Sequence, residues 1–185
     1  MDTLVYNPFF VETPAFFGLE LDELLAAKSP DAWPAFERGE LDEQDLARRY
    51  FRDGRSFDLA GLRARMFEAY RFLPGIEALL GELLAAGVEL HALSNYPVWW
   101  QLIEAKLELS RFMRWSFVSC ETGMRKPDPE AFTHAARALG REPGALVFVD
   151  DQARNCAAAQ AVGMRAIHFE DAASLGAQLR VQLML

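Results

Sequence analysis

The sequence predicts an α/β protein in which a block of helices is joined to a core built around a parallel sheet. Residues 14–72 show helical periodicity and contain no strand-like run of β-branched residues. After Pro74, short apolar runs alternate with helices of about 10 to 15 residues, which indicates βαβ units with parallel strands. The 185 residues suffice for one such core and a small inserted module.

The N-terminal block is expected to contain a series of amphipathic helices. The first carries leucines at helical spacing in FGLELDELLAAKS, and the second follows Asp31 as its N-cap, with Pro34 in its first turn. A third helix is capped by Asp42 and ends before Gly54, and the last stops at Pro74.

The remainder of the chain alternates between strands and helices. Helices are predicted in GIEALLGELLAAG, VWWQLIEAKLEL, DPEAFTHAARALG and ARNCAAAQAVG, and strands in VELHALSN, WSFVSC, ALVFVDD and MRAIHF. We therefore divide the chain into a remnant of the first core strand with its flap (1–13), a helical cap (14–72) and an α/β core (73–185). Ligands of such sheets bind beyond the carboxyl ends of the strands, so the residues there are the candidate site.

The composition limits the classes of partner. A net charge of −8 argues against nucleic acid or an anionic membrane as the main partner, because both attract basic surfaces. No apolar run approaches the roughly 18 residues of a membrane span. Cys120 and Cys156 lie in segments of interior character and no signal peptide is recognised, which favours a reducing, cytoplasmic compartment. An organelle-targeting segment upstream of Met1 stays open, as does the choice between monomer and homodimer.

Polar residues gather at the ends of three predicted strands. They are Ser94 and Asn95 after the first, Lys126 after the second, and Asp150, Asp151 and Asn155 after the third. A hydroxyl, backbone amides and a lysine hold phosphoryl oxygens, and paired carboxylates hold Mg²⁺. Taken singly, each is also explained by a turn, a helix cap or an acid at a helix N-terminus. Together they favour a small phosphorylated metabolite as ligand and Mg²⁺ as cofactor.

The ordered combination resembles motifs two to four of the haloacid dehalogenase (HAD) superfamily. GMRKPDPEAF and VFVDDQARNCAAAQAVGM resemble its subfamily with a helical cap after the first strand, and MDTLVYNPFF, ARRYFRDGR and SNYPVWW are similar to a plant-type branch associated with FMN hydrolysis. The resemblance implies a HAD-like, Rossmann-type fold and a Mg²⁺-dependent phosphatase, with FMN as a candidate substrate. It implies catalytic and phosphate-binding roles for Ser94, Asn95 and Lys126. Asp150 and Asp151 would hold the metal, supported by Asn155.

The first residues bear on the nucleophile. HAD phosphatases carry a first motif, Asp-x-Asp-x-Thr, whose first Asp forms an aspartyl-phosphate while a second acid protonates the leaving group. MDTL resembles the tail of this motif, which implies a nucleophile upstream of Met1 and makes Asp2 the candidate acid. The first strand would then be incomplete, and we expect these 185 residues alone to fold poorly. An alternative keeps the chain whole, with Asn7 at the nucleophile position of a catalytically inactive binding protein.

The helical cap supplies candidates for substrate contact. Trp33, Tyr50 and Arg52 could stack on and pair with a flat anionic molecule, because aromatic rings stack and arginine binds anions. Aromatic residues at helical spacing also commonly form the core of a helical block, and this alternative is kept for Trp33 and Tyr50.

Overall fold

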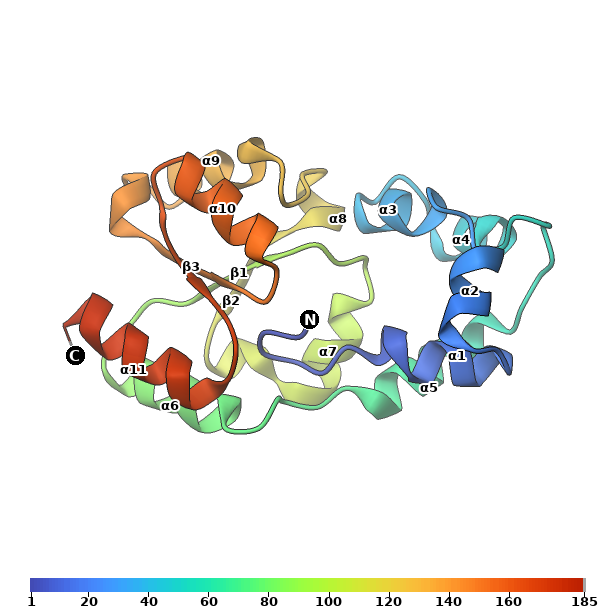
Figure 1. Cartoon of the computed structure of the whole chain (residues 1–185), viewed down its shortest axis with the longest axis horizontal. Helices are drawn as coiled ribbons and strands as arrows, with labels where there is room; N and C mark the ends of the chain where they lie inside the picture. The colour runs from blue at the N-terminus through green and yellow to red at the C-terminus, as the bar shows by residue number, and fades with distance from the viewer. Residues whose placement is uncertain (185) are drawn as a thin grey trace.

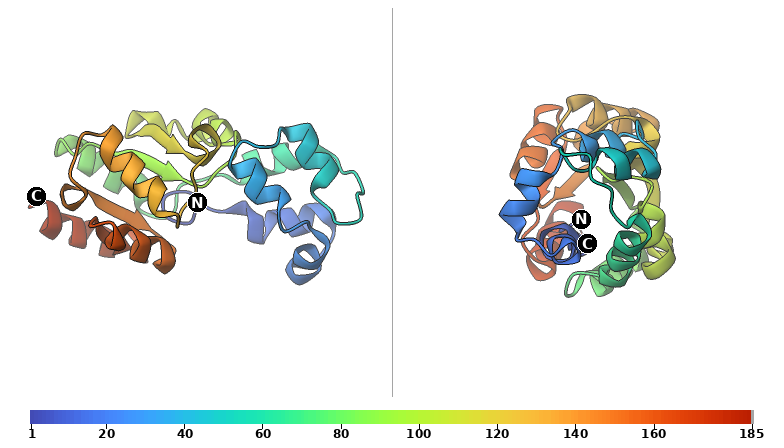
Figure 2. Two further views of the ribbon diagram at one scale, coloured as in Figure 1. Left: turned by 90° about the horizontal axis from the view of Figure 1, so that it is seen from above. Right: turned by 90° about the vertical axis from the view of Figure 1, so that its right-hand side faces the viewer.

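The structure, a computed structural model, describes residues 1–184 and places a helical region beside a region of alternating strands and helices (Figure 1). The helical region comprises the 3-10 helix η1 (Pro8–Phe10) and the helices α1 (Glu12–Phe17), α2 (Leu21–Ala27), α3 (Ala32–Glu37), α4 (Glu43–Arg49) and α5 (Leu59–Ala69). These helices extend the molecule along its long axis, away from the strands (Figure 2).

The second region alternates as the sequence predicted. In chain order it contains α6 (Ile76–Ala85), β1 (His91–Ser94), α7 (Trp100–Leu107), η2 (Leu109–Arg111), β2 (Arg114–Val118), α8 (Ser119–Thr122), α9 (Pro129–Ala138), η3 (Pro143–Ala145), β3 (Val147–Asp150), α10 (Ala153–Ala161), β4 (Arg165–His168) and α11 (Ala172–Leu183). Among residues 1–184, no helix is long and apolar enough to cross a membrane.

All strand pairs are parallel, which confirms the predicted α/β class. β1 pairs with β2 so that Ser94 lies opposite Val118, and β3 pairs with β4 so that Asp150 lies opposite His168. Within residues 1–184 these are two separate two-stranded sheets, because β1 and β3 are not hydrogen-bonded to each other. Ser94 and Asp150 are the last residues of β1 and β3, whereas Lys126 follows β2 after the short helix α8.

Helices cover both sides of the strands (Figure 1). On one side, Phe132 of α9 packs edge-on against Phe148 of β3, with ring centroids 5.1 Å apart, and Ala159 of α10 is fully buried beside them. On the other side α6 contacts α11, where Gly176 lets the helices approach, since a Cβ there would lie 3.2 Å from a methyl group of Leu79. The strand ends, rather than the strand faces, are thereby left for ligands.

Residues 3–6 do not belong to either sheet, contrary to the expectation that they form part of the first core strand. Asp2 has a positive φ of 52° and its amide donates to the carbonyl of Val5 at 2.7 Å, so the chain turns sharply. Val5 then forms an antiparallel bridge to Phe72. We call 4–6 and 71–73 the crossing segments, because they run side by side between the helical region and the strands.

Other boundaries differ from the prediction for local reasons. The second strand stops at Val118, because the next residue, Ser119, begins the short helix α8. The helix α11 was not predicted; its N-cap Asp171 accepts a hydrogen bond from the amide of Ser174 at 2.9 Å. The helical block begins at Glu12 of α1, earlier than the predicted boundary.

The packing of α9 on β3 yields a stability prediction. Replacing the fully buried Phe132 by alanine should lower the free energy of unfolding by about 3–5 kcal/mol, because it removes an aromatic ring and leaves a cavity. The control is Phe10→Ala, whose side chain is 53% exposed and which should cost at most about 0.5 kcal/mol. Urea unfolding of both variants measures the difference. Equal losses would contradict the assigned core.

Candidate active site

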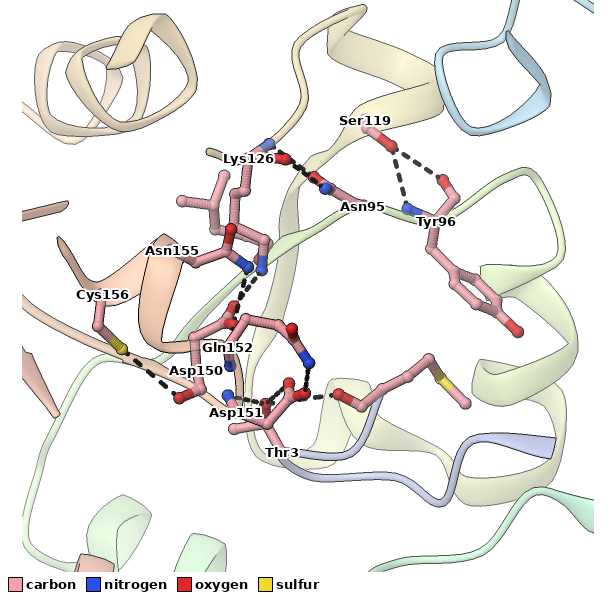
Figure 3. Close-up of polar contacts among 12 residues, drawn as sticks. Thr3, Asn95, Tyr96, Ser119, Lys126, Asp150, Asp151, Gln152, Asn155 and Cys156 are labelled. Atoms are coloured by element: carbon pink, nitrogen blue, oxygen red, sulfur yellow. Dashed lines mark hydrogen bonds and ion pairs between the residues drawn. The ribbon is translucent and has the colours of Figure 1, made fainter. Parts of the chain in front are cut away.

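A buried ion pair joins the ends of β1 and β3 (Figure 3). Nζ of Lys126 lies 2.7 Å from Oδ2 of Asp150 and donates to the carbonyl oxygen of Leu93 at 2.6 Å. The side chains of Lys126 and Asp150 are only 10% and 4% exposed. Since Leu93 belongs to β1 and Asp150 to β3, one lysine side chain fixes the two sheets relative to each other.

The carboxylate of Asp150 is fully engaged. Its Oδ1 accepts hydrogen bonds from Nδ2 of Asn155 and from the backbone amide of Gln152, each at 2.8 Å. Burial by itself would raise the pKa of Asp150. The charge and hydrogen bond of Lys126, followed by the hydrogen bonds of Gln152 and Asn155, lower the pKa by more than burial raises it. The pKa of Asp150 therefore lies below its ordinary value, and the group is a carboxylate at neutral pH.

Asp151 is held by the N-terminal segment and by its neighbour. The Thr3 hydroxyl donates to Oδ1 of Asp151 at 3.0 Å, and Nε2 of Gln152 donates to Oδ2 at 2.6 Å. The α-amino group of Met1 is buried beside these residues, and its pKa is lowered by burial and by the charge of Lys126. The N-terminal segment therefore lies next to the acid pair.

The acid pair fits a magnesium ion. Within residues 1–184, no three or more Asp, Glu, His or Cys side chains gather closely enough to hold a metal. Mg²⁺ does not require such a cluster, because proteins commonly hold it by one or two carboxylates, with waters and a substrate phosphate as the other ligands. Asp151 is the more available ligand, since it is half-buried, whereas Asp150 is buried and forms an ion pair with Lys126.

The residues after β1 lie where the sequence placed them, but Asn95 has a different set of contacts. Ser94 ends β1 and is half-buried. Nδ2 of Asn95 donates to the carbonyl oxygen of Lys126, and Oδ1 of Asn95 accepts from the amide of Lys126, each at 2.8 Å. Because the side-chain amide is used on this backbone, the geometry favours positioning of Lys126 over direct phosphate binding by Asn95.

A pocket of about 210 Å³ lies between the helical region and the core. Its lining residues are Met1, Asn7, Phe9, Lys28, Trp33, Glu37, Met66, Asn95 and Tyr96. Of the three cap candidates, Trp33 lines this pocket, whereas Tyr50 and Arg52 do not. Tyr50 is 2% exposed and stacks on Phe17 in the helical core, and Arg52 is exposed and donates to the carbonyl of Lys28.

Two charged pocket residues were missed from the sequence. Oε1 of Glu37 accepts a hydrogen bond from Nε1 of Trp33 at 2.8 Å, and the spacing of four residues on α3 was the available signal. Burial raises the pKa of Glu37, although the neighbouring Arg125 counteracts this. Lys28 follows α2 and is half-buried. Burial lowers its pKa, and the negative charge of Glu37 acts in the opposite direction.

Asp2 and Asn7 are tied into the loop that leads to η1. Oδ1 of Asp2 accepts from the amide of Asn7 at 3.2 Å, and Oδ1 of Asn7 accepts from the amide of Phe9 at 3.1 Å, which caps η1. Asp2 is half-buried and precedes Thr3, whose hydroxyl donates to Asp151, so the N-terminal segment brings it toward the acid pair. Asn7 lines the pocket but uses its carbonyl oxygen as a helix cap.

Comparison with known proteins identifies relatives over nearly the whole chain. The chain is 46% identical to flavin mononucleotide hydrolase 1 of Arabidopsis thaliana, a chloroplast protein by its name, over 97% of this chain and 73% of that protein. It is 31% identical to a sesquiterpene phosphatase of Aspergillus oryzae, over 88% of this chain and 84% of that protein.

Solved structures agree at the level of the fold. A HAD-like hydrolase from Porphyromonas gingivalis, 19% identical, superposes with a TM-score of 0.70 over 98% of this chain and 92% of that one. A HAD family enzyme from Bacteroides thetaiotaomicron, solved with magnesium and inorganic phosphate, is 21% identical with a TM-score of 0.66, over 88% and 86% of the two chains. The profile of the haloacid dehalogenase-like hydrolases matches residues 17–163, and the chain belongs to that family.

Proposed function

We propose that the full-length protein is a Mg²⁺-dependent phosphatase of a small phosphomonoester, with FMN as the first substrate to test. The observation that carries the proposal is the buried pair of Lys126 and Asp150 beside Asp151, which puts one cation and two carboxylates at the same strand ends. The 46% identity to a protein named for FMN hydrolysis supports the choice of FMN.

Each residue at the strand ends has a role in this proposal. Asp151, with help from Asp150, would hold Mg²⁺, which would supply positive charge against the phosphoryl oxygens. Lys126 adds a second positive charge at the same place, and Asn95 fixes the backbone that carries it. The hydroxyl of Ser94 and the backbone amides that follow β1 donate to phosphoryl oxygens.

The nucleophile of the proposed reaction is an aspartate upstream of Met1. The Thr3 hydroxyl contacts Asp151, so in this proposal the chain that precedes Thr3 reaches the same site. Its carboxylate attacks phosphorus and forms an aspartyl-phosphate as the P–O ester bond breaks, and Asp2 is the candidate that protonates the departing alkoxide. Water then hydrolyses the acyl phosphate and releases inorganic phosphate. Asn7 is a weaker candidate, because it caps η1.

The helical segment 14–72 serves in this proposal as a cap that selects the substrate. Lys28, Trp33 and Phe9 give the pocket a cation and two aromatic rings, which suit a phosphate attached to an apolar or aromatic group. The pocket of about 210 Å³ is smaller than the 300–1,000 Å³ usual for ligand sites. A substrate as large as FMN therefore requires the cap to move away from the core, or binds with its ring system outside the pocket.

The first test is phosphate release from FMN by the full-length protein. We expect turnover with Mg²⁺ that EDTA abolishes. Asp151→Asn should lower kcat by about 100-fold or more, because a bound metal lowers the activation barrier by several kcal/mol. Activity that persists in EDTA would contradict the metal-dependent mechanism. Turnover of p-nitrophenyl phosphate but not of FMN would retain the phosphatase and reject this substrate.

The alternative of an inactive binding protein makes the opposite prediction. It expects no phosphate release from any of a panel of phosphomonoesters, even with the full-length chain and Mg²⁺, while inorganic phosphate still binds in calorimetry. That pair of results would favour a binding protein.

The hydrogen bond from Asn155 to Asp150 predicts an effect on metal affinity. Asn155→Ala should weaken Mg²⁺ binding by about 10- to 100-fold, because groups that orient metal ligands have effects of this size. Gln160→Ala is the control, since Gln160 is an exposed residue on the same helix α10 and should bind Mg²⁺ as the wild type does. Calorimetric titration with Mg²⁺ checks both variants. Equal affinities would show that Asn155 does not orient the pair.

The lowered pKa of Asp150 predicts a pH dependence of stability in the metal-free protein. Its folded-state pKa lies below the unfolded value of about 3.9, so its contribution is complete above that value and is lost as pH falls through the folded pKa. Stability should therefore decrease below about pH 4. In urea unfolding at a series of pH values in EDTA, the free energy of unfolding of Asp150→Asn should fall less below this pH than that of the wild type. Parallel curves for the two proteins would contradict the assignment.

A further inference from the structure

A second polar contact joins the helical region to the core, away from the acid pair. Oε2 of Glu37, at the end of α3, lies 2.7 Å from Nε and 2.6 Å from Nη2 of Arg125. The hydroxyl of Ser119 donates to the carbonyl oxygen of Glu37 at 2.5 Å. Ser119 is fully buried and Glu37 is 7% exposed, so this contact lies inside the junction rather than on its rim.

The backbones also approach closely at this junction. Gly39, just after α3, has a φ of +73°, and any side chain there would collide with the carbonyl oxygen of Cys120. The end of α3 is thus fitted to the segment 119–126 by its backbone as well as by its side chains.

Arg125 immediately precedes Lys126, and the two residues are anchored from opposite sides. Arg125 is held by Glu37 of the helical region, whereas the backbone amide and carbonyl of Lys126 are held by Asn95 of the core. Each residue has only two freely rotating backbone angles, so a displacement of Arg125 is transmitted to the backbone of Lys126. Nζ of Lys126 has little freedom to compensate, because it is bonded to Leu93 and Asp150.

We propose that Glu37 is a positioning residue that couples the docking of the helical cap to the placement of Lys126, through Arg125. With α3 seated on 119–126, the lysine has an anchor on each side. When α3 leaves, the anchor on the cap is lost, and of these side-chain contacts only those of Asn95 still hold the backbone of Lys126. The kinetic part of this inference rests on the proposed phosphatase function, and its structural part does not.

The contacts favour action through Arg125 over direct contact with substrate. Oε1 of Glu37 is occupied by Trp33, and Oε2 is occupied by two nitrogens of Arg125. The Glu37 side chain is buried while that of Arg125 is 31% exposed, so removing Arg125 leaves a buried charge without its partner, whereas removing both relieves that cost. The two residues should therefore behave as one unit.

The helical region offers a matched control contact. Oε1 of Glu43, on α4, accepts a hydrogen bond from Nε1 of Trp99, the N-cap of α7 in the core. This contact also joins the cap to the core but does not involve 119–126. Glu43→Gln therefore measures the effect of weaker docking alone, and Glu37→Gln measures docking together with the link to Lys126.

The kinetic test compares Glu37→Gln, Arg125→Gln, the double variant and Glu43→Gln in the full-length protein. The two single variants should lower kcat by about 10- to 100-fold, as small misplacements of catalytic groups do, with KM changing less than kcat. The double variant should lose no more than either single variant, because coupled residues are not additive. Glu43→Gln should keep kcat close to that of the wild type. A rise in KM for Glu37→Gln that Arg125→Gln does not share would overturn the inference in favour of direct substrate contact.

Hydrogen–deuterium exchange supplies a readout that needs no catalysis. Amides of 119–128 should exchange faster in Glu37→Gln and Arg125→Gln than in the wild type or Glu43→Gln. If the wild type proves inactive and exchange still rises selectively, the coupling stands and the proposed phosphatase function fails. Equal exchange in Glu37→Gln and Glu43→Gln would refute the coupling whatever the activity. Should a single variant unfold, the double variant removes both charges and allows the same comparison.

Discussion

The ion pair of Lys126 and Asp150 is the interaction on which the rest of the site depends. Within residues 1–184, β1 and β3 belong to separate sheets, and Lys126 contacts both strands. Taking two charges out of water costs several kcal/mol for each ion, so a buried pair persists only when its remaining polar atoms are also satisfied. Here Leu93, Asn155 and the Gln152 amide supply those partners. The result is a rigid polar network at the strand ends.

Rigidity at the strand ends matters for the chemistry that we propose. A transferring phosphoryl group offers the protein little covalent work, so positioning and charge account for most of the catalytic effect. Lys126 and the acid pair are pre-arranged, and no large reorganisation is needed before a phosphate meets positive charge. The pocket above these residues takes Trp33 and Lys28 from the helical region.

Much of the core could be predicted from the sequence, because parallel strands bring their carboxyl ends to the same edge. Ser94, Lys126 and Asp150 were placed in this way without any knowledge of tertiary contacts. The helical region was harder. Trp33 and Tyr50 are both aromatic and both at helical spacing, and only packing decides that the first lines the pocket while the second is buried.

Local patterns also failed where a tertiary contact overrides them. Residues 3–6 have the composition of a strand, but the turn at Asp2 and the pairing with Phe72 direct them elsewhere. The helix α11 contains Gly176, which lowers helix propensity, yet this glycine permits the approach of α6. Arg125 was passed over beside the more conspicuous Lys126, since its partner Glu37 lies far away in the sequence.

The crossing segments reduce the entropy that is lost when the helical region docks on the core. Two backbones, joined by the Val5–Phe72 bridge and by the stacking of Arg71 on Tyr6, connect the helical region to the core. A double tether of this kind keeps the two surfaces at a high effective concentration, of the order of millimolar even for a short flexible linker. Re-association is then an intramolecular event with little entropy left to lose. The pair of Glu37 and Arg125 therefore adds to the packing of Trp99 on Trp33 and Phe36 without a further loss of this entropy.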